Sequence, residues 1–232
     1  MASSATSSSR VETVVMQLRQ GVFEGRYPPG TALRELTLAR ELSVSQATIR
    51  EALQQLQYTG LVTRTPNVGS MVTRLSVKEV RERVELRTLL EVKAALEART
   101  NMGQEEFAEL ERRLAALETA VASDSYFEAA QADLEFHRYI WQCSGNETIC
   151  RHLELVTVPL FAFISILRSQ GLERLVNTVE GHRPLVDALR SGSARQIRVE
   201  FEKGATSAYG RFLGGDGHAV LAAFGLLDPV AK

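Results

Sequence analysis

The sequence predicts a mainly α-helical protein, in which an N-terminal winged helix-turn-helix with a small β wing is joined to an all-α helical bundle. Three observations support this fold class. Two helical segments within residues 36–58 are separated by a three-residue connection. Two short β-type segments follow them, around a turn that contains Pro, Asn and Gly. Beyond residue 75 almost every segment has helical periodicity.

The N-terminal part covers residues 10–75, and its apolar spacing divides it into elements. The segment Tyr27-Pro28-Pro29-Gly30 ends the first helix, because proline cannot continue the hydrogen-bond ladder. Ser45 is a good N-cap for the third helix, since its hydroxyl can accept a hydrogen bond from a free amide of the first turn. We expect helices over residues 11–23, 36–42 and 46–58, and wing strands over residues 61–64 and 70–73.

The second part covers residues 76–213 and reads as a helical bundle. We expect its helices over residues 77–100, 104–122, 126–143, 147–169, 172–190 and 194–213. Residues 1–9 are Ser-rich and uncharged, which predicts a disordered arm. Residues 214–232 form a Gly-rich and then apolar C-terminal tail.

Charge is distributed unevenly along the chain. The whole chain has a net charge of -1, but residues 10–74 hold eight Arg and five Glu, so this part carries +3 and the remainder -4. A basic module beside an acidic one is typical of a phosphate-facing domain joined to a partner domain. The pattern favours nucleic acid as a ligand of the N-terminal part.

The remaining composition predicts a cytoplasmic protein. Its two cysteines, Cys143 and Cys150, are too few for a disulfide framework and lack the CxxC spacing of a zinc or redox pair. Free thiols fit a reducing compartment. The N-terminus lacks the basic and apolar regions of a secretory signal, and no run of about 18 apolar residues predicts a membrane span.

A set of short motifs runs collinearly through residues 27–72. They are Pro28-Pro29-Gly30, Leu38-Ala39, Val44-Ser45, Arg50-Glu51-Ala52-Leu53, Gly60-Leu61 and Gly69. In this order they resemble the DNA-binding domain of GntR-type bacterial regulators. A second set of motifs lies in the bundle: Glu85-Leu86-Arg87 with Glu91, the segment from Asp133 to Phe136-His137, and His182 followed by Leu185 and Ala188-Leu189. These resemble the FadR-like branch of the family, whose C-terminal FCD domain binds small acids.

The resemblance implies that the start of the third helix contacts base edges. The positions concerned are Ser45, Gln46, Ala47, Thr48 and Arg50. They face away from the apolar side of the helix, at the end that reaches the major groove. An arginine here can bind guanine or phosphate, and a glutamine can pair with adenine. The alternative is that these are ordinary solvated surface residues.

Three further residues join this set of DNA contacts. Arg34 can bind phosphate, Asn67 in the wing turn can touch the minor groove, and Gly69 serves the turn itself. Many relatives have arginine at the position of Gln46, and Thr-Pro or Thr-Thr in place of Ala47-Thr48. We therefore expect an operator different from the usual family site.

The bundle carries a candidate metal site. Asp133 and His137 are four residues apart, so both project from one face of a helix, a spacing that suits two ligands of one ion. His182 on a later helix can complete a set that fits Zn, Ni, Mn or Fe. Many FCD domains add a histidine one helix further on, but near Gly204 this chain has none. The alternative is a buried polar pair of Asp133 and His137 without metal.

Arg87 is the residue that we expect to hold the carboxylate of an effector, since its planar fork matches that group. The alternative for Arg87 is an ion pair with Glu91, four residues later on the same helix face. The effector's identity depends on the packing of residues such as Phe161 and Arg168, which shape the pocket.

These features predict a homodimeric transcription regulator. Each N-terminal domain reads one half-site of a DNA operator, and a small organic acid in the C-terminal effector-binding and dimerisation domain controls operator affinity. One alternative is a DNA-binding protein with a vestigial, effector-free bundle. Another is a metal-dependent hydrolase, but no general base has a convincing spacing and the DNA-binding domain would be unexplained.

Overall fold

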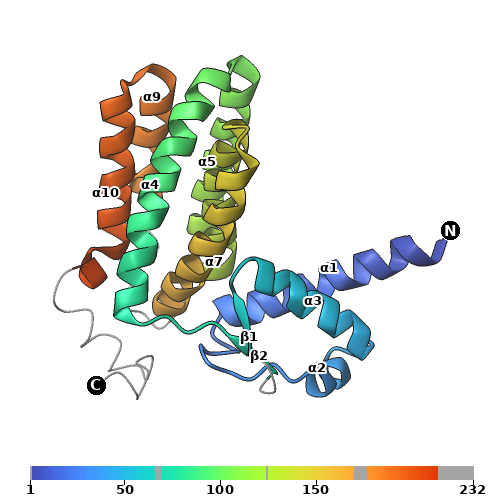
Figure 1. The fold of residues 1–232 in the computed structure, drawn as a ribbon. Helices are drawn as coiled ribbons and strands as arrows, with labels where there is room; N and C mark the ends of the chain where they lie inside the picture. Colours follow the sequence, from blue (N-terminus) through green and yellow to red (C-terminus); the bar gives the residue numbers. More distant parts are fainter. Residues whose placement is uncertain (1, 66–68, 124, 170–176, 214–232) are drawn as a thin grey trace.

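The computed structural model describes residues 2–65, 69–123, 125–169 and 177–213. In chain order the elements are α1 (Ala2–Phe23), α2 (Glu35–Glu41), α3 (Gln46–Tyr58), β1 (Val62–Thr65), β2 (Gly69–Val72), α4 (Val77–Asn101), α5 (Gln104–Ala122), α6 (Tyr126–Cys143), α7 (Glu147–Ser169), α8 (Asn177–Glu180), α9 (His182–Ser191) and α10 (Ala194–Leu213). Figure 1 shows the long helices of the bundle standing beside one another, with the small N-terminal domain at one end. The predicted fold class is confirmed.

The N-terminal domain is a winged helix-turn-helix. The apolar face of α3, formed by Ile49, Leu53 and Leu56, is buried in one core with α1. Ser45 caps α3, since its Oγ accepts a hydrogen bond from the Thr48 amide at 3.1 Å. Strands β1 and β2 pair antiparallel to form the wing, and a bridge from Ala32 to Met71 adds a third short segment.

The structure differs from the sequence prediction at the N-terminus. Residues 1–9 were expected to be a disordered arm, but α1 begins at Ala2. The segment contains no Gly or Pro, and Ser and Ala can both extend a helix that the apolar residues from Val11 onward already hold in place. The C-terminal tail, residues 214–232, lies outside the described residues.

The bundle follows the predicted boundaries closely. A capping box starts α4, in which the Ser76 Oγ accepts from the Glu79 amide and the Glu79 side chain accepts from the Ser76 amide. The helix expected over residues 172–190 is different in its described part, because α8 ends at Glu180 and α9 begins at His182. Pro184 in the first turn of α9 has no N–H to donate to the carbonyl four residues earlier, so the helical hydrogen-bond ladder is interrupted there.

Helix α7 contacts α4 and α6 within the bundle and α1 in the N-terminal domain. Among the described residues it is the one helix whose length and composition would allow a membrane crossing, but 67% of its apolar window is buried inside the protein. The edge-to-face pair of Phe23 and Phe127, with ring centroids 5.9 Å apart, adds a contact between the domains. The Arg83 Nη1 donates to the Leu155 carbonyl at 3.0 Å and holds α4 against the same part of α7.

Gly60 lies at a close contact between the N-terminal domain and α7. Its φ is +71°, and a Cβ built there would lie 2.8 Å from the Leu155 carbonyl oxygen and 3.3 Å from Pro159 Cγ. Gly25 has a φ of +77° with nothing within 4 Å, so it shares the backbone strain without the contact.

We expect Gly60→Ala to lower the free energy of unfolding by about 1–3 kcal/mol, because it combines left-handed strain with displacement of α7. Gly25→Ala should lose only the strain component. Urea unfolding followed by circular dichroism measures both. Equal losses in the two variants would contradict the close contact at Gly60.

Candidate DNA-binding surface and ligand cavity

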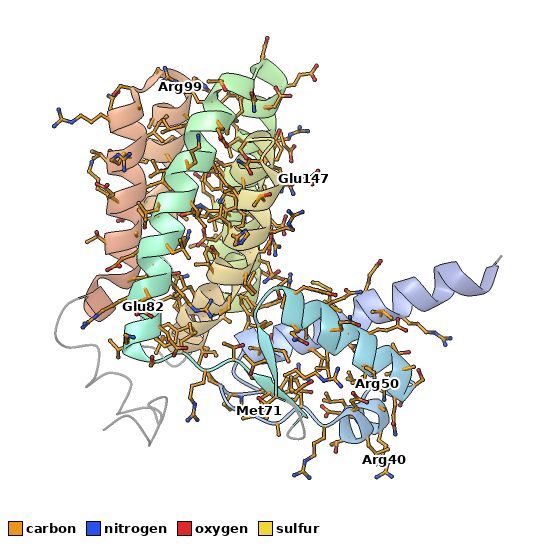
Figure 2. All side chains as sticks on the ribbon, viewed as in Figure 1. Arg40, Arg50, Met71, Glu82, Arg99 and Glu147 are labelled. Carbon is orange, nitrogen blue, oxygen red and sulfur yellow. The ribbon has the colours of Figure 1, made fainter. Side chains whose placement is uncertain are left out.

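The predicted base-reading residues form one exposed surface on the N-terminal domain. Ser45, Gln46, Ala47 and Arg50 are exposed and Thr48 is half-buried. This surface includes the N-terminal end of α3 and points away from the bundle (Figure 2). Such an arrangement leaves the end of α3 free to enter a major groove.

The other predicted DNA contacts lie around this surface. Arg34 is exposed immediately before α2. Gly69 is exposed at the start of β2 with a φ of +104°, a conformation that favours glycine and agrees with its expected role in the wing turn. Asn67 lies outside the described residues.

Arg50 has a partner that the sequence analysis did not identify. Its Nη2 donates to Glu35 Oε2 at 2.8 Å, and its Nε lies 3.2 Å from the same oxygen. Glu35 stands in the first turn of α2, fifteen residues earlier, so only the packing of α2 on α3 brings the two together. The pair holds the guanidinium at the α2–α3 edge of the surface.

The second candidate site is a cavity of about 80 Å³ in the middle of the bundle. Helices α4, α6, α7, α9 and α10 provide its walls. Its polar lining consists of Arg87, Glu91, Asp133, His137, Arg168, His182, Ser207 and Tyr209. Phe161, Ile164, Leu185 and Phe201 supply much of the apolar wall. A buried cavity with a few converging polar groups is the usual form of a small-ligand site.

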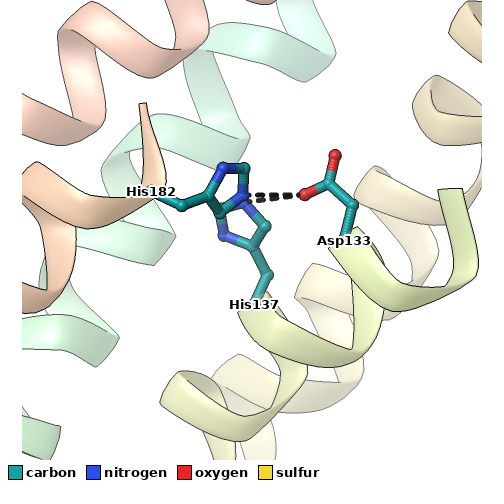
Figure 3. Close-up of side chains that lie close together, drawn as sticks. All are labelled: Asp133, His137 and His182. Carbon is teal, nitrogen blue, oxygen red and sulfur yellow. Dashed lines mark hydrogen bonds and ion pairs between the residues drawn. The ribbon is translucent and has the colours of Figure 1, made fainter. Parts of the chain in front are cut away.

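Asp133, His137 and His182 come together in this cavity, as their spacing and the family resemblance predicted. The His182 Nε2 lies 2.9 Å from Asp133 Oδ1, and the His137 Nε2 lies 3.5 Å from the same oxygen (Figure 3). Metal bonds of 2.0–2.2 Å at octahedral or tetrahedral angles place ligand atoms roughly 2.8–3.6 Å apart. Both distances to Asp133 Oδ1 fall in this range, and the three donor atoms lie within 4.8 Å of one another, so a common divalent ion needs only a small adjustment of the side chains.

The protonation of Asp133 suits a ligand role. Burial alone would raise the pKa of this carboxyl, but the neighbouring His182, His137 and Arg168 lower it below its ordinary value. The carboxylate is thus ionised and accepts the hydrogen bond from His182 Nε2–H. A metal ion would replace that proton, because a ligating histidine nitrogen must be deprotonated.

Arg87 adopts the alternative arrangement, an ion pair with Glu91. The Arg87 Nε donates to Glu91 Oε2 at 2.9 Å and its Nη2 to Oε1 at 3.2 Å. The Trp141 Nε1 also donates to Glu91 Oε1 at 3.2 Å. Burial opposes ionisation of Glu91, but Arg87 and His137 beside it lower its pKa to about 2. The Arg87 guanidinium, which was expected to bind the carboxylate of an effector, is therefore already paired with the carboxylate of Glu91.

The structure has open space beside Gly204, near the position at which this chain lacks the additional histidine of many FCD domains. Gly204 on α10 lines the cavity, and a Cβ built there would meet nothing within 4 Å. Glu202, the nearby acid, is exposed. Among the described residues the candidate metal group thus consists of three protein side chains around a space left open on the α10 side.

The fold defines a class of protein, a DNA-binding regulator with a winged helix-turn-helix and a separate helical domain. Residues 10–72 match the family model of the bacterial regulatory proteins of the gntR family, and residues 82–199 match that of the FCD domain. The chain belongs to the GntR family of transcription regulators and carries a C-terminal FCD domain.

Similar proteins are named as transcription regulators. A probable D-xylose utilization operon transcriptional repressor of Paenarthrobacter nicotinovorans is 29% identical over 188 residues, covering 81% of this chain and 80% of that protein. An HTH-type transcriptional regulator in an unstable DNA locus of Streptomyces ambofaciens is 32% identical over 201 residues, covering 80% and 78%.

Solved structures share the fold. McbR/YncC of E. coli superposes with a TM-score of 0.73 at 20% identity, over 88% of this chain and 97% of that one. A GntR regulator from Rhodococcus sp. RHA1 gives 0.69 at 21% identity, over 89% and 99%.

Loss of the Glu91 charge should destabilise the bundle. We expect Glu91→Gln to lower the free energy of unfolding by about 3–5 kcal/mol, because it leaves the Arg87 charge buried and unpaired. Since the pKa of Glu91 falls from 4.5 to about 2 on folding, the contribution is complete above pH 4.5 and is lost as the pH falls toward 2. Urea unfolding at pH 7 and pH 3 measures this.

Glu97→Gln is the matched control, since Glu97 forms an ion pair with Lys93 at the same spacing on α4, where 29% of the Glu97 and 61% of the Lys93 side chain is exposed. This variant should unfold almost as the parent protein does. A Glu91→Gln protein as stable as the control would show that the buried pair has no special role.

Proposed function

We propose that this regulator binds an operator as a homodimer in the cytoplasm and that a small organic acid, held with a divalent metal ion in the FCD cavity, changes its affinity for DNA. The observation that supports this proposal is the cavity itself, which combines three converging metal-ligand side chains with two buried arginines, Arg87 and Arg168. Its volume accommodates roughly five to eight water-sized groups, which suits an acid of a few carbons.

Asp133, His137 and His182 would hold the metal ion, for which Zn, Ni, Mn or Fe are suitable. When bound, the ion supplies a positive centre that attracts a carboxylate oxygen to the open side of the group. The neighbouring side chains orient the acid, and Phe161 and Phe201 exclude water from it.

A second copy of the chain is proposed as the partner. Leu86 and Leu89 lie one turn apart on α4, with 44% and 62% of their surface exposed. Exposed leucines that adjoin on one helix mark an interaction surface. Pairing through α4 would give two DNA-binding domains, as a two-fold symmetric operator requires.

Selection from a random duplex library tests the proposal. The purified protein, with Zn²⁺, should enrich a two-fold symmetric site, and a short carboxylic acid should change its affinity for that site by at least about fivefold. Enrichment of a site without any response to acids or metal would favour the alternative of a vestigial, effector-free bundle.

Arg50→Ala should weaken binding to the selected operator at least about tenfold, because one charge-assisted contact to guanine or phosphate is lost. Fluorescence anisotropy at fixed salt measures the dissociation constant. Arg99→Ala serves as control, since this arginine lies at the far end of the bundle (Figure 2). Equal affinities in the two variants would remove Arg50 from the DNA contacts.

Gly204→His should strengthen Zn²⁺ binding at least about tenfold, because it supplies a fourth protein ligand on the open side of the group. Gly210→His places the same side chain six residues later on α10, at a residue that does not line the cavity. Isothermal titration with Zn²⁺ compares the two. No gain in Gly204→His over the control would argue against an ion at Asp133, His137 and His182.

A further inference from the structure

We propose that Arg168, and not Arg87, is the residue that anchors the carboxylate of the acid in the FCD cavity; this inference rests on the proposed function. Arg168 lies in the last turn of α7 and lines the cavity together with Asp133 and His182. Only 8% of its surface is exposed. A guanidinium at this depth is almost always paired with an acid.

No such pair is formed within the part of the chain that the structure describes. The Arg168 Nε is buried without a hydrogen-bond partner, and no carboxylate oxygen of a described residue lies within ion-pair distance of this guanidinium. Asp133 is near enough for the Arg168 charge to lower its pKa, but the Asp133 Oδ1 accepts its hydrogen bond from His182 and not from Arg168. Arg168 therefore presents free donors to the cavity.

Arg87 is in the opposite situation. Both edges of its guanidinium are engaged, by Glu91 through Nε and Nη2 and by the Tyr209 hydroxyl through Nη1 at 3.3 Å. The Phe161 ring covers its face, with the Arg87 Cζ 4.9 Å from the ring centroid. A ligand carboxylate at Arg87 would have to displace Glu91, which costs the pairing of a buried charge.

The two cations thus have different roles. Arg87 and Glu91 neutralise each other and fix the shape of the wall. Arg168 offers the planar fork that binds a carboxylate through two parallel hydrogen bonds. A short acid bound there would have its other end beside Asp133, His137 and His182, and the walls of Ile164 and Phe201 would enclose its carbon atoms. The ligand class is a small carboxylic acid with a second oxygen donor for the metal ion.

The test is calorimetric titration of the full-length, Zn²⁺-loaded protein with glycolate, lactate, pyruvate, malonate and succinate, with lactamide as the uncharged analogue. Arg168→Gln should weaken the binding of the acids by about 10- to 100-fold, because a charge-assisted, bidentate contact is lost. Arg168→Lys should recover only part of the affinity, since it keeps the charge without the fork. Arg151→Gln, an exposed arginine on the same helix, is the control.

Thermal unfolding separates an anchor from a structural role. Without acid, Arg168→Gln should unfold close to the temperature of the parent protein, because Arg168 forms no ion pair or hydrogen bond within the described residues that the substitution would break. A lower melting temperature together with unchanged acid affinity would overturn the proposal and assign Arg168 to packing. Acid binding that survives in Arg168→Gln would overturn the anchor alone. If no acid binds to the parent protein, the proposed effector function fails together with its anchor.

Discussion

Helix α7 is buried on two faces, and both domains are packed against it. One face presents Phe161, Ile164 and Arg168 to the cavity, at intervals of three and four residues that keep them on one side of the helix. The other presents Pro159, Ala162 and Ile166 to the N-terminal domain, where they face Leu61 and Val72. A ligand that moves α7 by a fraction of a helical turn must therefore also move the surface on which the DNA-binding domain packs. Close-packed interiors transmit such displacements because they have little free volume.

The charges of the cavity explain why this shared helix can respond to an anion. Glu91 pairs with Arg87 and accepts a hydrogen bond from Trp141, so the charges of Glu91 and Arg87 neutralise each other. Asp133 is held by His182. Arg168 lies on α7 and forms no direct ion pair within the described residues, although its charge acts on Asp133. An acid that pairs with Arg168 and the metal ion binds most tightly when α7 holds the guanidinium and the metal group at the separation that the acid spans. The acid therefore has different affinities for different positions of α7, as a population shift requires.

Local signals in the sequence predicted the elements and part of the site. Apolar periodicity and caps such as Ser45 depend on near neighbours, so they placed α3 to α7 almost to the residue. The spacing of Asp133 and His137 likewise follows from the helix geometry alone.

Tertiary packing decided what the sequence could not predict. The spacing of four residues is compatible with an ion pair between Arg87 and Glu91, but also with an Arg87 guanidinium that is free to bind a ligand. Only the burial of both residues selects the ion pair. Glu35 meets Arg50 across the turn of the helix-turn-helix, which no spacing rule indicates. The N-terminal arm was judged by composition, whereas continuation from an already packed α1 determines its helix.

The most direct test of the coupling through α7 is a linkage measurement. The dissociation constant of a short carboxylic acid is determined for the Zn²⁺-loaded protein, first free and then saturated with its selected operator. Because coupling between two sites is reciprocal, an acid that changes DNA affinity must itself bind with a different affinity to the DNA-bound protein. Our account predicts that the two constants differ by at least about fivefold. Two equal constants, with acid bound in both cases, would contradict it.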